Sequence, residues 1–296
     1  MRLASYDGRA HLVVGHGVID VEEASGGRWP GPHGSVFDDW TAFRDWASDV
    51  SDVEPRPFDP ERLGAPSPTP RQVFEIGLNY SAHAAEGGMD PPKVPPTFTK
   101  YLSSLVGPFG DIALPSATVD WEVELVVVVG LESTRVEEDH AWSHVAGLTI
   151  GQDLSDRVVQ LQPPAPQFSL GKSFPGFGPT GPFLVTPDDF DDPDNLRLGC
   201  SINGETMQDG RTADLIFSVP RLIAHLSSVA TLHPGDLIFT GTPSGVGMGR
   251  QPPRFLQPGD ELTTWIEGIG EMRHRLVAPS TGEAAMSTPR LEEHAR

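Results

Sequence analysis

Two glutamates lie within the most apolar segment of the chain. Glu122 and Glu124 belong to the run Asp120-Trp121-Glu122-Val123-Glu124-Leu125-Val126-Val127-Val128-Val129-Gly130. Alternate residues of a β-strand point to the same side, so the two carboxylates share a face with Val126 and Val128. Because both faces of the segment are apolar, the pattern predicts a strand that is buried on both sides.

Burying these two carboxylates together requires a positive partner. Desolvating one carboxylate is costly, and a second one beside it adds repulsion, so a divalent cation would relieve both penalties. Asp153 follows another apolar stretch and could supply a third oxygen ligand. A ligand set without Cys or His suits Mg²⁺, Mn²⁺ or Ca²⁺. The alternative is a strand that ends at the surface, with both glutamates in water.

A histidine and a glutamate three residues apart form a second candidate group. His83 and Glu86 lie in Asn79-Tyr80-Ser81-Ala82-His83-Ala84-Ala85-Glu86-Gly87-Gly88. On a short helix they would be neighbours on one face. A carboxylate beside an imidazole fixes its tautomer and raises its basicity, as a general base for water requires. The two glycines would end the helix and let it move as a lid. A solvated surface pair is the alternative.

Lysine is rare in this chain, which makes one lysine a further candidate. Lys172, in Ser169-Leu170-Gly171-Lys172-Ser173-Phe174, is the only Lys or Arg between Arg157 and Arg197. It is one of three lysines, with Lys93 and Lys100. In an acidic protein this position favours a role beside a negative group, and an ordinary surface lysine is the alternative.

The glycine-rich segment Gly241-Thr242-Pro243-Ser244-Gly245-Val246-Gly247 resembles a phosphate-binding loop at first sight. No Gly-Lys-Ser/Thr follows it, and Pro252-Pro253 comes too soon for a dinucleotide-binding helix. We therefore interpret it as a backbone nest that receives a carboxylate, helped by the Thr242 hydroxyl. An ordinary tight turn is the alternative.

Other common catalytic patterns are weak or absent in the sequence. His140 and His144 have a spacing that suits zinc, but no third His or Cys follows at a useful distance, and the acidic surroundings indicate a solvated helix. There is no Gly-x-Ser-x-Gly motif, and Cys200 has no evident base beside it. These observations disfavour a hydrolase with a Ser or Cys nucleophile.

The composition limits the partners and the compartment. The chain has 296 residues, a net charge of −20 and 38% hydrophobic residues. The negative charge disfavours nucleic acid and anionic membranes, and an anionic substrate would need local positive charge. A single cysteine excludes an intramolecular disulfide. With neither a signal-peptide pattern nor an apolar run of membrane-spanning length, we expect a cytoplasmic protein.

The residue order predicts a strand-dominated α+β protein in four segments. These are a small β-rich domain at 1–63, a Pro-rich linker at 64–70, a large domain with few helices at 71–278, and a flexible tail at 279–296. The expected elements are a hairpin over 12–21, a helix near 40–47, a strand at 73–77, a hairpin over 198–208 that turns at Asn203-Gly204, a helix after Ser218, and strands at 237–240 and 261–266.

Taken together, these stretches resemble the fumarylacetoacetate hydrolase family. The motifs that carry the resemblance occur in this order: Gly77-Leu78-Asn79-Tyr80-x-x-His83, Asp120-Trp121-Glu122-Val123-Glu124-Leu125, Asp153-x-Ser155-x-Arg157, Gly171-Lys172-Ser173-Phe174, Asn203-Gly204-Glu205, Asp214-x-Ile216-Phe217, and Pro234-Gly235-Asp236 through Gly247. The resemblance covers about residues 71–278 and is to bacterial 2-hydroxyhepta-2,4-diene-1,7-dioate isomerases and acylpyruvases. It implies a mixed β-sheet roll and a homodimer.

The resemblance also implies roles for ten residues. The ligands of Mg²⁺ or Mn²⁺ match Glu122, Glu124 and Asp153. The pair that activates water and the lysine that stabilises an enolate match His83, Glu86 and Lys172. Positions that touch the substrate match Tyr80, Arg157, Gln160 and Thr242.

Four residues at three places depart from the pattern of many relatives. Gln152 stands where Asn is frequent, Asp156 replaces a frequent alanine, and Pro175 with Gly176 follows Lys-Ser-Phe in place of Asp-Thr. The substrate of a relative therefore cannot be transferred to this chain.

The implied function is metal-dependent hydrolysis of the C3–C4 bond of a 2,4-dioxo acid, of the acylpyruvate or fumarylpyruvate type. The products would be pyruvate or a derivative and a carboxylic acid. Decarboxylation of oxaloacetate, and isomerisation or hydration of a 2-oxo-alkenoate, would use the same enolate. A ligand-binding relative without activity and an acidic structural protein are further alternatives, and the complete set of candidate residues argues against both.

Overall fold

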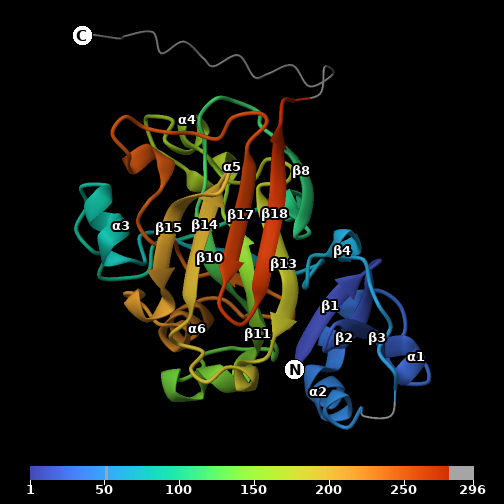
Figure 1. Cartoon of the computed structure of the whole chain (residues 1–296). Coiled ribbons are helices and arrows are strands. Elements are labelled where there is room, and N and C mark those ends of the chain that lie inside the picture. The colour runs from blue at the N-terminus through green and yellow to red at the C-terminus, as the bar shows by residue number, and fades with distance from the viewer. Residues whose placement is uncertain (51–52, 280–296) are drawn as a thin grey trace, which may run out of the picture.

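Two β-sheets lie face to face in this computed structural model, which describes residues 1–50 and 53–279 (Figure 1). The larger sheet follows the order β3-β2-β1-β13-β11-β10-β16-β5-β6, with β4 beside β1 and β7 beside β13. Its strands are β1 (Arg2–Tyr6), β2 (Arg9–Val14), β3 (Gly17–Asp20), β4 (Leu63–Gly64), β5 (Val73–Ile76), β6 (Thr97–Thr99), β7 (Leu105–Val106), β10 (Val123–Val129), β11 (Val145–Gln152), β13 (Gly178–Val185) and β16 (Leu237–Phe239).

The second sheet has five strands in the order β15-β14-β17-β18-β8. They are β8 (Phe109–Ala113), β14 (Arg197–Ile202), β15 (Glu205–Arg211), β17 (Glu261–Ile266) and β18 (Gly270–Val277). A short separate pair is formed by β9 (Val119–Asp120) and β12 (Ser155–Asp156). The predicted strand-dominated α+β fold is therefore confirmed.

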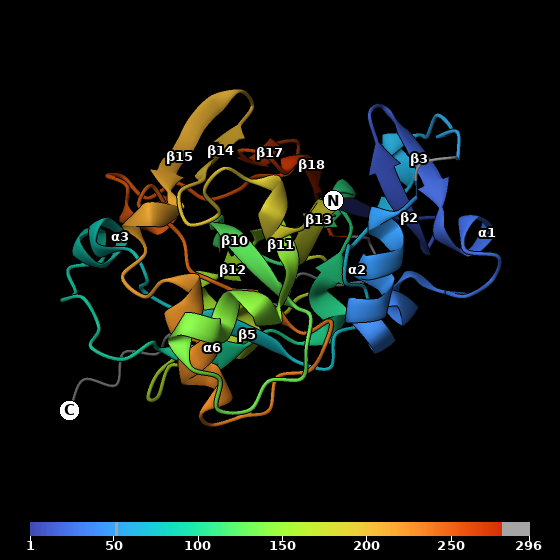
Figure 2. The same cartoon turned by 90° about the horizontal axis from the view of Figure 1, so that it is seen from below.

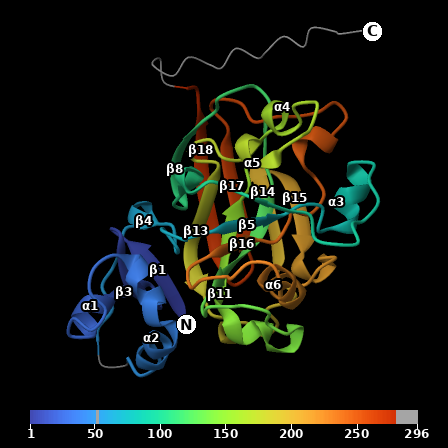
Figure 3. The same ribbon diagram turned by 180° about the vertical axis from the view of Figure 1, so that it is seen from behind.

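The helices are short. They are α1 (Val21–Ala24), α2 (Trp40–Ser48), α3 (Ser81–Glu86), α4 (Arg157–Gln160), α5 (Phe168–Gly171) and α6 (Val219–Ser227). Ser218 caps α6 by accepting a hydrogen bond from the amide of Arg221, and Pro220 lies in the first turn. Figure 3 shows α3 at the side of the larger sheet, just beyond β5.

Strand β10 is buried on both faces, as its sequence predicts. Val123, Leu125 and Val127 belong to the core between the two sheets. Val126 and Val128 belong to a second core, on the opposite face. Glu124 points to the same side of β10 as Val126. Its carboxylate therefore lies on this second face, near the beginning of the strand.

The turn chemistry of the second sheet is also confirmed. Asn203 and Gly204 connect β14 and β15, with φ of 52° and 81°. Positive φ at both central residues is what a type I′ turn requires, and its twist matches that of the strands it joins. The strands expected near 237–240 and 261–266 are β16 and β17.

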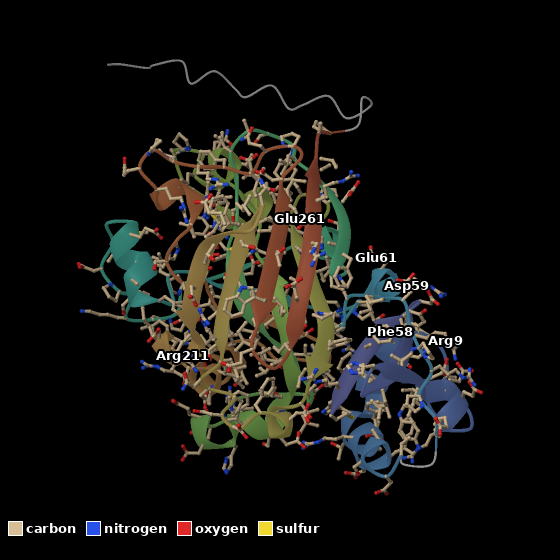
Figure 4. All side chains as sticks on the ribbon, in the orientation of Figure 1. Arg9, Phe58, Asp59, Glu61, Arg211 and Glu261 are labelled. Carbon is tan, nitrogen blue, oxygen red and sulfur yellow. The ribbon has the colours of Figure 1, made fainter. Side chains whose placement is uncertain are left out.

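The N-terminal elements extend the larger sheet. The expected hairpin is β2 and β3, and the expected helix is α2. Strand β1 pairs with β13, and Figure 2 shows the N-terminal elements beside that strand. Phe58, labelled in Figure 4, faces Phe183 of β13 across this boundary, with ring centroids 6.5 Å apart. The Ser67 hydroxyl, in the expected linker, is buried and donates to the carbonyl of Gly235.

The division into four segments stays a prediction, and the tail expected at 279–296 lies outside the described residues from 280 onward. Within the described part of the chain, no helix has the length and apolar character needed to cross a bilayer.

Two buried histidines should make the fold sensitive to acid. Burial lowers the pKa of both His33 and His274 to about 4. Since an unfolded histidine titrates near 6.5, the unfolded state binds more protons between pH 6.5 and 4. The free energy of unfolding should therefore fall as the pH falls through this window, by up to about 3 kcal/mol for each histidine.

Denaturant titrations from pH 4 to 7 test this expectation. His274→Gln should reduce the slope of stability against pH, because it removes one of the two groups. His140→Gln is the matched control, since His140 is exposed. Equal slopes for the wild type and His274→Gln would show that His274 does not contribute.

Candidate active site

Three carboxylates meet at the ends of β10 and β11. Val123 pairs with Gln152 in the antiparallel ladder, so the residues flanking this pair lie together. The amide of Asp153 donates to the carbonyl of Glu122 at 2.9 Å. Glu122, Glu124 and Asp153 are buried, and one oxygen of each lies within 4.8 Å of the others. The structure thus brings together the three residues expected to bind a metal.

Three cationic side chains surround these carboxylates. The Lys172 ammonium donates to Glu122 Oε2 at 3.0 Å, to Ser155 Oγ at 2.8 Å, and also to Asp153. Lys100 donates to Asp153 Oδ1 at 2.8 Å. The Arg157 guanidinium lies 2.7 Å from Glu122 Oε1.

The balance between burial and charge differs from one carboxyl to the next. Burial alone would raise the pKa of Glu122, but Lys172 and Arg157 outweigh it and hold that pKa well below its usual value. Burial, together with Asp153, raises the pKa of Glu124 well above its usual value. The same causes raise the pKa of Glu75 to about 8. At Glu75 and Glu124, burial and neighbouring carboxylates therefore outweigh the nearby cations, and both groups resist ionisation.

The residues present fit a divalent cation. Glu75, Asp120, Glu122, Glu124 and Asp153 are all buried, and Glu75 and Glu124, whose pKa values are raised, would be fully ionised only beside a further cation. Among the described residues, both carboxylate oxygens of Glu75 lack a hydrogen bond, although Lys100 lies 3.5 Å from one of them. A dication bound by oxygen ligands would balance the cluster. Within residues 1–50 and 53–279, only this trio brings its ligand atoms close enough together, and His140 and His144 are not part of it.

The His83–Glu86 pair, expected to act as a general base, lies on α3 and lines the same cavity. His83 Nδ1 is 3.3 Å from Glu86 Oε2, and the amide of Gly245 donates to both Glu86 oxygens. Burial alone would raise the pKa of Glu86, but the hydrogen bonds from His83 and Gly245 lower it below its usual value. An ionised Glu86 keeps a proton on Nδ1, which leaves Nε2 of His83 as the acceptor.

The glycine-rich loop does receive carboxylates, but they belong to the chain itself. The amide of Gly241 donates to Glu124 at 2.7 Å, and Gly245 donates to Glu86. The amide of Gly247 donates to Asp120 Oδ1 at 2.7 Å. Gly241 and Gly245 have φ of 101° and 106°, which L side chains rarely adopt. One backbone segment therefore binds Glu86 of α3, Glu124 of β10 and Asp120 of β9.

The cavity has a volume of about 330 Å³ and contains most of the expected substrate residues. Arg157, Gln160 and Thr242 line it together with His83 and Glu86. Other cavity-lining residues include Glu122, Glu124 and Lys172.

Two of the side chains expected to bind the substrate also form hydrogen bonds within the protein. Gln160 accepts a hydrogen bond from Arg157. The Thr242 hydroxyl donates to the Val123 carbonyl and accepts from Gln208.

Tyr80 is the expected substrate residue that is not brought to this cavity. Its side chain is buried, and its hydroxyl has no hydrogen-bond partner among the described residues.

Several residues of the site were not identified from the sequence. Asp120 accepts two hydrogen bonds from Arg157, at 2.8 and 2.9 Å, and holds it against Glu122. Lys100 and Glu75 lie 3.5 Å apart beside Asp153. The rarity of lysine could have identified Lys100, since two of the three lysines are buried here. Asp120 stands in the motif Asp120-Trp121-Glu122-Val123-Glu124-Leu125 but has no role assigned from the sequence, and no comparable signal marks Glu75.

The acidic trio should bind one Mg²⁺ or Mn²⁺ ion. Calorimetric titration of metal-free protein should show a single site, and the bound ion should raise the melting temperature. Glu122→Gln should weaken binding by more than about 100-fold, because even the loss of an outer partner of a ligand costs about 10- to 100-fold. Glu138→Gln makes the same chemical change at an exposed position and is the control. Unchanged affinity in Glu122→Gln would contradict the assignment.

Comparison with known proteins places the chain in a family. Residues 72–277 match the family described as Fumarylacetoacetate (FAA) hydrolase C-terminal. The chain is 44% identical over 215 residues to Oxaloacetate tautomerase FAHD2A, mitochondrial, of Homo sapiens, covering 72% of this chain and 68% of that protein.

Solved structures give the same result. An HpcE-like protein from Mycobacterium smegmatis is 54% identical with a TM-score of 0.90, covering 94% of this chain and 99% of that one. Maleylpyruvate hydrolase from Sphingobium sp. SYK-6, in complex with manganese (II) ion and pyruvate, is 28% identical with a TM-score of 0.77, covering 94% and 99%. With its sheets, its acidic trio and these matches, the chain belongs to the fumarylacetoacetate hydrolase family.

Proposed function

We propose that this protein is a metal-dependent hydrolase that cleaves the C3–C4 bond of a 2,4-dioxo acid of the acylpyruvate or fumarylpyruvate type. One water is consumed, and the products are pyruvate or a derivative and a carboxylic acid. The observation that carries the proposal is the position of the His83–Glu86 pair, which lines the same cavity as Glu122, Glu124 and Lys172. A base for water therefore faces a centre suited to an enolate.

The residues present support Mg²⁺ or Mn²⁺ as the cofactor. Glu122, Glu124 and Asp153 would hold the ion, and when bound it would polarise the oxygens of the substrate and offset the negative charge that develops. The manganese and pyruvate bound by the Sphingobium hydrolase are consistent with this choice.

The reaction follows from the positions of His83 and Lys172. Nε2 of His83 takes a proton from water, and the oxygen of that water bonds to the C4 carbonyl carbon. The C3–C4 bond then breaks, and its electron pair leaves as the enolate of the pyruvate part. Burial alone would lower the pKa of Lys172, but its carboxylate neighbours raise that pKa above the usual value. The Lys172 ammonium therefore stays charged and stabilises the enolate. The proton held by His83 can pass to C3, which completes the balance.

Tautomerisation of oxaloacetate is the second candidate, and the similarity to the human protein favours it. That reaction moves a proton between C3 and the C2 oxygen and consumes no water. The same base and the same stabilising centre could perform it. Oxaloacetate decarboxylation and 2-oxo-alkenoate isomerisation would also pass through the enolate. The homodimer and the cytoplasmic location stay predictions.

Removing the base should separate its role from that of the metal. His83→Ala should lower kcat on an acylpyruvate by about 10²- to 10⁴-fold, the usual range for loss of a general base. Its affinity for Mg²⁺ should barely change, because His83 is not among the proposed ligands. His140→Ala is the control for removal of an exposed histidine. Normal hydrolysis by His83→Ala, or loss of its metal, would show that the assigned role is wrong.

The glutamate of the pair should distinguish hydrolysis from its rivals. Glu86→Gln should depress acylpyruvate cleavage far more than oxaloacetate decarboxylation, since only hydrolysis needs activated water. Lys172→Met should depress both, because both pass through an enolate. Pyruvate release from each substrate measures cleavage and decarboxylation. Loss of the enol absorbance of oxaloacetate without pyruvate release measures tautomerisation. Activity in that last assay alone would replace the hydrolase proposal with the tautomerase.

A further inference from the structure

The cavity changes character between its floor and its mouth. The charged groups lie at the floor, where Glu122, Glu124 and Lys172 are 5%, 2% and 2% exposed. At the mouth the lining side chains are Met89, Leu161 and Met248, which are 47%, 43% and 40% exposed. A 2-oxo acid that binds with its charged end at the floor would place the rest of its chain at the mouth.

An aromatic wall connects the two ends. The Phe98 ring lies under the Lys172 ammonium, with 5.4 Å between the nitrogen and the ring centroid. Phe98 in turn meets Phe168 edge-on, with centroids 5.3 Å apart. Both rings line the cavity. A group that extends from the floor towards the mouth would therefore pass along apolar surface.

The cations of the cavity are already engaged. Among the described residues that line it, Arg157 and Lys172 carry permanent positive charge. Arg157 is held by Asp120, Glu122 and Gln160, and Lys172 is held at the floor.

Two nearby arginines lie outside the lining. Arg250 donates to the carbonyl of Met207 at 2.9 Å and lies over the Trp121 ring, and its buried Nε has no hydrogen-bond partner among the described residues. Arg254 donates to Glu205 at 2.7 Å. A second carboxylate near the mouth would therefore meet thioether, aliphatic and aromatic groups in a protein of net charge −20.

From this arrangement we infer that the acyl part of the substrate is apolar and uncharged, so that the enzyme acts on monoanionic acylpyruvates in preference to dicarboxylic ones. The inference rests on the proposed function for the orientation of the substrate. The methionines at the mouth adapt to different shapes, so acyl groups of several sizes should be accepted. The cavity volume, at the lower end of the range for ligand sites, limits them to short chains.

Binding tests the inference without turnover. In the presence of Mg²⁺, 2-oxohexanoate and 2-oxoadipate have equal carbon chains and differ only at the end that would reach the mouth. We expect 2-oxohexanoate to bind at least about tenfold more tightly in calorimetry, because the second carboxylate loses water without gaining a partner. Equal affinities, tighter binding of 2-oxoadipate, or no binding of either compound would overturn the inference.

Turnover gives the second measurement. The kcat/KM for 2,4-dioxoheptanoate should exceed that for 2,4-dioxoheptanedioate by a similar factor. If neither compound is cleaved but 2-oxohexanoate still binds preferentially, the hydrolase proposal fails and the apolar preference stands. If both are cleaved with equal efficiency, the hydrolase proposal stands and the apolar preference fails.

A charge placed at the mouth should reverse the preference. Leu161→Arg should raise the affinity for 2-oxoadipate relative to 2-oxohexanoate by about tenfold or more. Leu170→Arg is the matched control, because Leu170 is 63% exposed on α5 and does not line the cavity. The control changes the net charge equally and should leave the ratio within twofold of the wild type. An equal change in both variants would show that the overall charge, and not the mouth, sets the preference.

Discussion

The arrangement of this molecule depends on how it keeps several carboxylates out of water. The antiparallel pairing of β10 and β11 places Glu122, Glu124 and Asp153 in one buried volume. Such a group is unstable without positive charge, because desolvation and mutual repulsion act in the same direction. Lys100, Arg157 and Lys172 supply part of that charge, and the remaining deficit suits a divalent ion. The arrangement of the site and the divalent ion that we propose for it therefore follow from one electrostatic requirement.

The two sheets hold this cluster in place. Strand β10 packs on the second sheet with one face and on the N-terminal core with the other, so the backbone that carries the glutamates is rigid. Helix α3 lies beside this cluster, and its last residue, Glu86, is bound by His83 and by the amide of Gly245. A rigid floor suits the proposed reaction, since the charged groups must stay fixed while the substrate enters and leaves.

The strong negative charge of the protein fits the same picture. An anionic substrate is repelled at long range, so its entry would depend on the positive charge that the proposed divalent ion, Lys172 and Arg157 bring to the floor of the cavity. Because the arginines and lysines there are bound to carboxylates, little of that charge reaches the mouth. The first carboxylate of a substrate can be accepted at the floor, and a second one at the mouth has no partner.

The sequence by itself determined much of the fold and the candidate site. The period-two alternation around Glu122 predicts a strand buried on both faces. Asn203-Gly204 predicts the hairpin of β14 and β15. Both signals depend on neighbouring residues, so the sequence alone reveals them. The order of short motifs identifies the family, and the spacing of His83 and Glu86 on one helical turn brings that pair together.

Only the tertiary structure decided the rest, because those contacts join segments far apart in the chain. Lys100 meets Asp153 across 53 residues, and Arg157 meets Asp120 across 37. Neither contact has a local pattern in the sequence. The glycine-rich loop was expected to receive a carboxylate, but only the folded chain shows that its amides bind Glu86, Asp120 and Glu124. Burial determines which charged groups need partners, and burial is a property of the packed molecule.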